Sequence, residues 1–119
     1  MSVFTQANVI NALAVTGTNS YYSPVQKIQN VRDCSYQLSW TGTPTGTFAV
    51  WVSNKFLPDT TTDNDWVQLS LAVAIVQPAG AASKDIADIS AAPFMHMRLK
   101  YVNASGSGTI TADFCGKGL

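Results

Sequence analysis

Hydrophobic and polar residues alternate on both sides of a turn near the middle of the chain. A segment over 34–40 and a second over 48–52 place every second side chain on an apolar face, at the period of a β-strand. The apolar faces consist of Cys34, Tyr36, Leu38 and Trp40 before the turn, and of Phe48, Val50 and Val52 after it. Thr, Gly and Pro residues over 41–47 separate the two segments, so we predict a β-hairpin. The phase places Trp40 in the core and Trp51 on the outer face.

Further strands follow from the same alternation. We predict strands over 25–31, 66–71, 93–102 and 109–114, while 83–89 fits either a strand or a single helical turn. The residues expected to face the core are Val67, Leu69 and Leu71, then Met95, Met97, Leu99 and Tyr101, and finally Ile110, Ala112 and Phe114. In the strand predicted over 93–102, the opposite, polar face carries His96, Arg98 and Lys100. A hairpin loop is expected to follow this strand over 103–108.

About eight short strands separated by turn signals are typical of an all-β fold, an antiparallel β-sandwich or jelly roll. Residues 1–20 are weakly patterned, and we expect an N-terminal arm or a first edge strand there. The sandwich domain is expected over 21–119. A chain of 119 residues with 46% hydrophobic residues is long enough for one such domain.

Charge is sparse and balanced along the chain. Seven Lys or Arg residues stand against seven acidic residues, all of them Asp, so the formal net charge is zero. We therefore expect no nucleic-acid and no membrane partner, because both need clustered basic residues or a long apolar span. The first residues lack the regions of a signal peptide, which favours synthesis and folding in the cytoplasm. A protein surface with little net charge associates readily, so we expect much of this surface to be covered by a partner in the working state. The alternative is a surface rich in Thr and Ser that stays in contact with water.

Residues suited to catalysis or metal binding are few. His96 is the single histidine, and no Gly-x-Ser-x-Gly motif accompanies it, so we expect a surface or interface histidine. Asp59, Asp63 and Asp65 share one loop without the pattern of a calcium loop, which favours a solvated acidic loop over a metal site. We therefore predict no catalytic residue, no cofactor and no metal, and a protein that is not an enzyme.

The cysteines and Trp51 give weaker signals. Cys34 shares the phase of the core residues and Cys115 does not, which favours two free thiols over a disulfide. Trp51 is out of phase with its apolar neighbours. It fits a protein interface, a second core layer or a carbohydrate contact.

Two runs of sequence resemble a known class of proteins. The run LSWTGTPTGTFAVWVSN over 38–54 and the run APFMHMRLKYVNASGSGTITADFCGK over 92–117 look like small virion proteins of tailed bacteriophages. The resemblance covers roughly residues 34–117 and consists of a pattern of strand and turn positions. Jelly rolls of the galactose-binding type share part of this pattern.

The resemblance implies a capsid decoration, or cementing, protein with a jelly-roll fold. Such a protein is made in the host cytoplasm and sits on the exterior of the virion, where it bridges subunits of the major capsid protein and associates with itself as a dimer or trimer. The contacts are then expected from outward aromatic residues and the N-terminal arm, namely Phe4, Tyr21, Tyr22, Trp51 and Phe56. The alternative is a carbohydrate- or receptor-binding module of a phage tail or fibre, with Asn54, Asp65 and Trp66 as ligand contacts.

Overall fold

The computed structural model describes residues 4–29, 31–90 and 92–118, and the side chains of these residues from Gln6 onward. Within these ranges the regular structure consists of β-strands, and no residue is helical. The strands are β1 (Phe4–Val15), β2 (Ser20–Tyr22), β3 (Gln26–Lys27), β4 (Asp33–Gly42), β5 (Thr45–Ser53), β6 (Val67–Gln68), β7 (Ser83–Ile89), β8 (His96–Ser105) and β9 (Gly108–Lys117). None of the described residues belongs to a helix that could span a membrane.

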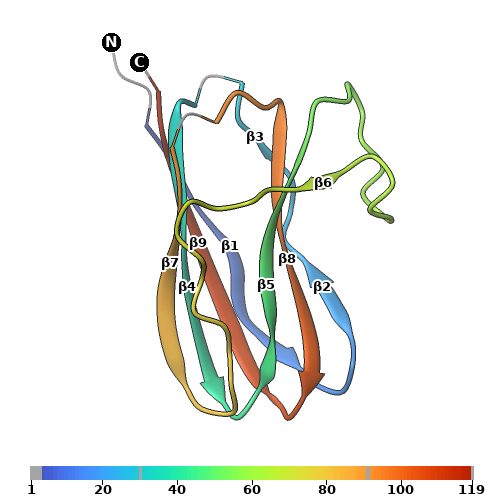
Figure 1. Cartoon of the computed structure of the whole chain (residues 1–119), viewed down its shortest axis with the longest axis vertical. Coiled ribbons are helices and arrows are strands. Elements are labelled where there is room, and N and C mark those ends of the chain that lie inside the picture. The colour runs from blue at the N-terminus through green and yellow to red at the C-terminus, as the bar shows by residue number, and fades with distance from the viewer. Residues whose placement is uncertain (1–3, 30, 91, 119) are drawn as a thin grey trace.

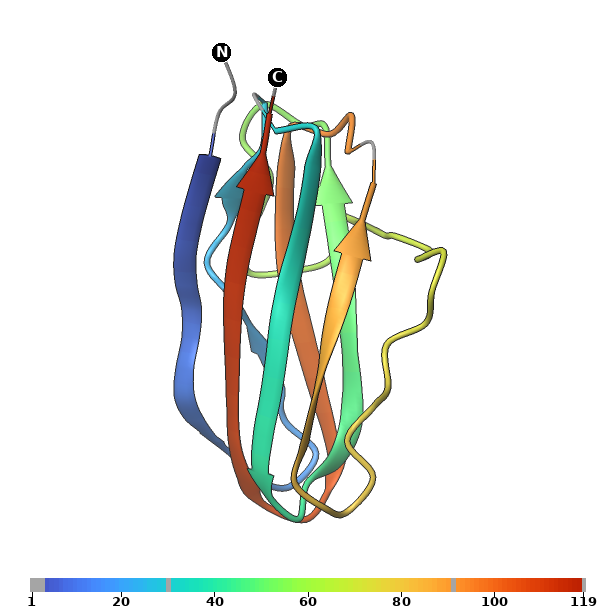
Figure 2. The ribbon, with the colours of Figure 1, turned by 90° about the vertical axis from the view of Figure 1, so that its left-hand side faces the viewer.

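Two antiparallel sheets pack face to face (Figure 1). One sheet has the strand order β1-β9-β4-β7, and Figure 2 shows this sheet in front of the other. The second sheet has the order β2-β8-β5-β6, with β3 also paired to β8. The expected all-β sandwich is therefore the observed fold. Residues 4–15 form β1, the edge strand beside β9.

The core lies between the sheets, and the alternation of the sequence explains it. In β4 the even positions from Cys34 to Trp40 are buried while the odd positions reach the outer face, as predicted. The same holds for Phe48, Val50 and Val52 in β5 and for Ile110, Ala112 and Phe114 in β9. Each strand thus contributes one apolar face, and the two sheets bury these faces against each other.

The connection between β4 and β5 is not the predicted hairpin. The two strands belong to different sheets, and so do β8 and β9 on either side of the predicted loop over 103–108. Gly42, with φ +77°, and Gly106, with φ +73°, turn the chain at these two corners. The corners also press together, since a Cβ atom on Gly106 would lie 2.1 Å from the Thr43 carbonyl oxygen. Alternation fixes which side chains face the core, but a corner between sheets preserves that alternation as well as a hairpin does.

Two other predicted segments differ from the structure. The strand expected over 25–31 contains only the two residues of β3, and the strand expected over 66–71 contains only the two residues of β6. Val67 is 69% exposed instead of inward, because β6 sits at the edge of its sheet beyond the core. The segment left open over 83–89 is a strand, β7, paired with β4.

The two cysteines occupy opposite faces of one sheet, as their phase predicts. Cys34 is buried beside Met97 and Cys115 is half-buried, and both are free thiols. Burial, together with nearby Asp33 and Asp88, raises the pKa of the Cys34 thiol to about 12. Cys34 therefore remains a neutral core residue at ordinary pH.

Candidate functional site

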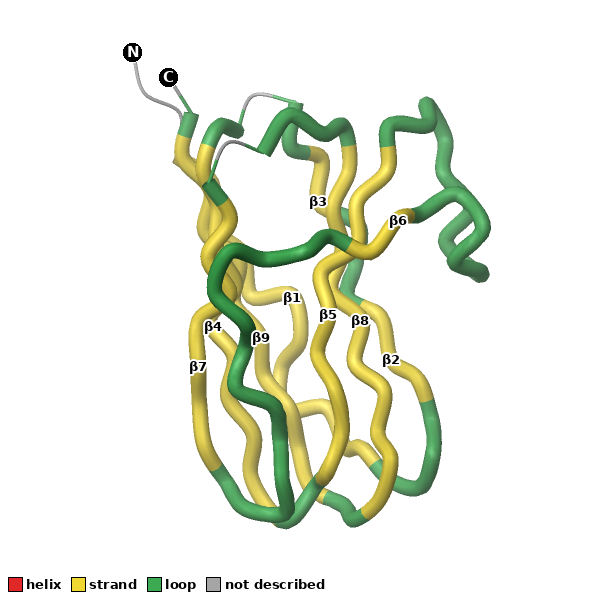
Figure 3. The backbone as a smooth tube through the Cα atoms, viewed as in Figure 1, coloured by secondary structure: helices red, strands yellow, loops and turns green. Residues whose placement is uncertain are grey.

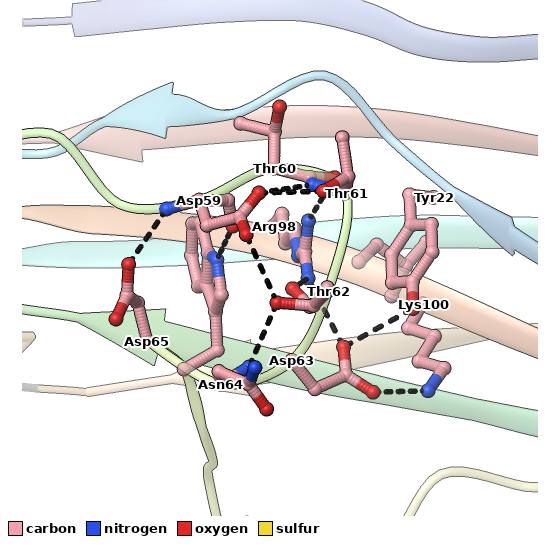
Figure 4. A network of polar contacts seen from close by, with 12 residues as sticks. Tyr22, Asp59, Thr60, Thr61, Thr62, Asp63, Asn64, Asp65, Arg98 and Lys100 are labelled. Carbon is pink, nitrogen blue, oxygen red and sulfur yellow. Dashed lines mark hydrogen bonds and ion pairs between the residues drawn. The ribbon is translucent and has the colours of Figure 1, made fainter.

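A long loop between β5 and β6 covers the outer face of the second sheet. Its residues 54–66, which we call the clamped loop, are held by Arg98 of β8 (Figure 4). The Arg98 guanidinium donates to the carbonyl oxygens of Thr60 at 3.0 Å and Thr62 at 2.8 Å, and it pairs with the Asp63 carboxylate at 3.0 Å. Arg98 is 1% exposed, so the loop buries a cation by surrounding it with acceptors.

Two aromatic rings close the space around the guanidinium. The Arg98 guanidinium carbon lies 4.1 Å from the ring centre of Tyr22 and 4.4 Å from that of Trp66. The Trp66 indole N–H donates to the Asp59 carbonyl oxygen at 2.8 Å. Cation–π contacts of this kind strengthen when the cation is removed from water, so the rings add to the clamp.

The acidic loop is exposed at Asp59, as expected of a solvated loop, and its carboxylates also form hydrogen bonds and ion pairs with the protein. Partial burial raises the pKa of Asp63, but bonds and charges from Lys100, Tyr22 and Arg98 outweigh it, so the pKa lies below its ordinary value. The hydrogen bond to Asp63 raises the pKa of Lys100 in turn. Asp59 accepts from the Thr61 backbone N–H, which lowers the pKa of its carboxyl. These contacts keep Asp63 charged and fix the loop in place.

The clamped loop carries two exposed apolar residues at its outer end. Phe56 is 84% exposed and Leu57 is 81% exposed, and we call this pair the apolar tip. On one side the tip borders a hollow of about 280 Å³ shared with Val25 and His96. Next to the tip lies a larger opening of about 510 Å³, which we call the apolar groove. The groove is lined by Val52, Ser53, Asn54, Lys55, Asp65, Val67, Gln68, Leu69 and Phe94.

A second long connection joins β6 to β7 and has the opposite character. Its residues 69–82, which we call the strap, run across the open side of the sandwich between the two sheets (Figure 3). No residue between Asp65 and Lys84 is charged. Val73 is 75% exposed and Val76 is 61% exposed, while Ile75 is buried and anchors the strap to the core.

The ends of the strap are bonded to the sandwich and its middle is not. The Leu69 amide donates to the Val50 carbonyl at 2.8 Å, and the Gln77 side chain bonds both the amide and the carbonyl of Phe48. The Gly46 amide donates to the Pro78 carbonyl. Within the described part of the chain, the backbone of residues 70–75 makes no hydrogen bond to another protein group. This stretch therefore offers free backbone donors and acceptors beside its exposed valines.

The predicted contact residues occupy different environments. Phe4 lies in β1 by its backbone, and its side chain falls outside those that the structure describes. Tyr21 packs against the core near Tyr101 instead of pointing outward, because β2 aligns these two residues across the sheet. Tyr22 belongs to the clamp, and its hydroxyl lies 3.2 Å from an Asp63 carboxylate oxygen. Trp51 faces outward but is half-buried, 5.3 Å from the Lys100 ammonium. Phe56 is the exposed member of the apolar tip.

The three alternative ligand contacts do not form a sugar-stacking platform. Trp66 is 4% exposed, and the Arg98 guanidinium covers its ring, so no face is free for a sugar. The Asn54 side-chain oxygen accepts from the Met95 amide, and an Asp65 carboxylate oxygen accepts from the Asp59 amide. Asn54 and Asp65 instead line the apolar groove.

His96 is buried at 5% exposure, which corrects its expected place on the surface. It lies on the face of β8 toward the clamped loop, and Lys27 of β3 and Ser53 of β5 are its partners on the two neighbouring strands. Within the described residues, no group of three or more His, Cys or Asp side chains converges to hold a metal ion.

Sequence reasoning missed both Arg98 and the strap as features of the site. The signal for Arg98 is its place on the polar face of an otherwise apolar strand, between His96 and Lys100, because a strand this apolar is expected to be covered. The signal for the strap is its long run without charge after an acidic loop. The arrangement provides binding surfaces made of exposed apolar side chains, held by a polar clamp.

Comparison with known proteins identifies the fold. No family model matches this sequence, and no curated protein is similar to it. A chain in the structure of infectious bursal disease virus Gx strain superposes with a TM-score of 0.61 at 9% identity, covering 98% of this chain and 32% of that one. The infectious bursal disease virus VP2 subviral particle gives 0.59 at 7% identity, with the same coverage.

The SPBc2 prophage-derived protein YomS is similar over nearly its whole length. It superposes with a TM-score of 0.59 at 10% identity, covering 98% of this chain and 95% of YomS. This chain thus spans about a third of the bursal disease virus chains and almost all of YomS. At these identities the likeness concerns the fold alone.

Proposed function

We propose that this chain is a non-enzymatic structural protein of a virion that decorates the exterior of the capsid and docks on the major capsid protein through the strap. The fold shared with a viral particle protein and a prophage-derived protein supports a virion role. The strap is the observation that carries the proposal, because its exposed valines lie in a run without any charge.

The composition of the strap suits a protein contact better than it suits water. Exposed apolar patches on soluble proteins mark interaction sites, and the centres of interfaces are depleted in charged residues. Val73 and Val76 would each contribute about 1.5–3 kcal/mol if a partner buried them fully. The unbonded backbone of residues 70–75 can pair with an extended segment of the partner, as in β-strand addition.

The proposed action is stabilisation by linkage. A protein that binds the assembled shell and not the separate subunits shifts the equilibrium toward the shell. Each copy bridges subunits that the shell already holds together, so its second contact forms at a high effective concentration and the overall affinity exceeds that of either contact alone. No chemical step is needed.

The test uses expanded capsids that lack the protein. The unmodified chain is expected to co-sediment with them and to raise their resistance to heat. The variant Val73→Asp/Val76→Asp places two charges on the strap and is expected to weaken binding at least tenfold. Leu13→Asp is the matched control, because Leu13 is 38% exposed on β1, at the edge of its sheet that lies opposite to β7 and the strap. Failure of the unmodified chain to bind, or equal loss in the control, would contradict the proposal.

A further inference from the structure

The apolar tip and the apolar groove lie side by side on the molecule. Lys55 lines the groove and directly precedes Phe56 of the tip, so a projection and an opening are neighbours on one surface. The groove has a volume of about 510 Å³, within the range that accommodates drug-sized ligands, and it has room for the two side chains of a tip. Its own tip does not fill it, since Phe56 and Leu57 border the separate hollow beside Val25.

The clamp holds the tip ready for a partner. Residues 60, 62 and 63, a few positions after the tip, are bonded to the buried Arg98. A segment fixed in this way loses little conformational freedom on binding, which removes a major cost of association.

Charges of opposite sign lie at the rim of the groove, where one Asp65 carboxylate oxygen already accepts from the Asp59 amide. Lys55 and Asp65 both line the groove, and among the described residues neither makes an ion pair. A second copy whose tip entered the groove would bring its own Lys55 toward the rim that carries Asp65. Complementary charges of this kind fix the register of a contact.

We propose that the occupant of the groove is the apolar tip of a second copy of this chain. The two copies are related by a two-fold axis, so that each tip enters the groove of the other and each Lys55 pairs with Asp65 of its neighbour. Because the apolar tip and the apolar groove are adjacent on one surface, a two-fold axis places the tip of each copy against the groove of the other. A single interface then fills both grooves. The formal net charge of zero means that two copies do not repel each other over long range.

The contact uses only the first residue of the strap, Leu69, and not its exposed valines, so it stands apart from docking on the capsid. Val73 and Val76 do not line the groove. A dimer joined at the tips would present two straps, and the shell would bind both together with the gain of avidity.

Sedimentation equilibrium of the full chain tests the proposal. The unmodified protein is expected to be a dimer at about 100 μM, and Phe56→Ser/Leu57→Ser is expected to raise the dimer Kd at least 100-fold. Both substituted residues are more than four-fifths exposed, so the fold is expected to remain intact in circular dichroism. Val67→Glu, which places a charge at the groove, is expected to disrupt the dimer equally.

Mixing the two variants provides the matched control. The tip variant retains its groove and the groove variant retains its tip. In their mixture the intact tip of one variant can enter the intact groove of the other, so heterodimers are expected although each variant alone stays monomeric. The strap variant Val73→Asp/Val76→Asp is expected to dimerise normally even if it fails to bind capsids. A monomeric unmodified chain, a dimer that survives loss of the tip, or a larger ring in place of a dimer would overturn the proposal.

Discussion

The two long connections on either side of β6 differ in composition and in how they are attached to the sandwich. Polar loops are usually solvated and apolar segments usually buried, but here the polar connection is bonded to the sandwich and the uncharged one exposes valines. The clamped loop carries Asp59, Asp63 and Asp65, and it is bound to the sandwich through the buried Arg98. The strap carries no charge, yet it exposes Val73 and Val76. The polar connection is thus fixed by the protein itself up to its apolar tip, whereas the uncharged one leaves the backbone of residues 70–75 unbonded.

This difference shows what holds a connection without regular structure. A loop rich in hydrogen-bonding side chains can fold onto a single buried cation, because each acceptor it supplies lowers the cost of that burial. The uncharged connection relies on a few anchors, here Ile75, the Gln77 side chain and the Asp85 carboxylate that accepts from the Val76 amide. In the clamped loop the apolar side chains left free are those of the tip, Phe56 and Leu57, whereas in the strap they are Val73 and Val76.

Removal of Arg98 is expected to cause the largest change. Arg98→Met takes away three charged contacts with the loop and leaves Asp63 with one cation, so the free energy of unfolding should fall by about 3 kcal/mol. Urea denaturation measures this change. Lys100→Met is the control and should cost less than about 1 kcal/mol, because the pair of Lys100 with Asp63 is more exposed. Equal losses would show that Arg98 is not the centre of the clamp.

The anchor of the strap is expected to matter less. Gln77→Ala removes the two bonds to the Phe48 backbone and should lower the unfolding free energy by about 1–2 kcal/mol. Gln68→Ala, at an exposed position in β6, should change it by less than about 0.5 kcal/mol. If the Gln77 variant were as stable as the control, the strap would not be anchored there.

Acid should weaken the clamped loop. The folded-state pKa of Asp63 lies below its ordinary value, so its contribution to stability is fully present above the unfolded-state pKa of about 3.9 and is lost as pH falls through the lowered folded-state pKa. Unfolding free energies measured from pH 7 to pH 2 should therefore fall at the acid end. The fall should be smaller in Asp63→Asn and unchanged in Val73→Asp, and identical curves for all three would count against the clamp.

Charge on the strap should have the smallest effect on stability. Val73→Asp changes a residue that is 75% exposed, so the unfolding free energy should move by less than about 0.5 kcal/mol. Thermal unfolding checks this value. A large loss would mean that Val73 supports the fold and is not available to a partner.

The sequence predicted the fold better than it predicted the site, for physical reasons. Alternation identified the inward faces of β4, β5 and β9, because core burial imposes a period of two on each strand. It could not tell the corner at Gly42 from a hairpin, since both keep the same faces inward. His96 and Arg98 were expected on a solvated face, because nothing local to β8 reveals that a loop more than thirty residues earlier in the chain folds over them.

Hydrogen exchange on the free and the capsid-bound chain tests the central claim most directly. In the free protein, the amides of Asp59, Thr61 and Trp66, which are bonded within the clamped loop, should exchange more slowly than those of residues 70–75. On expanded capsids, exchange over the strap should slow at least tenfold while the loop amides change little. Unchanged exchange over residues 70–76 in the bound protein would contradict docking through the strap.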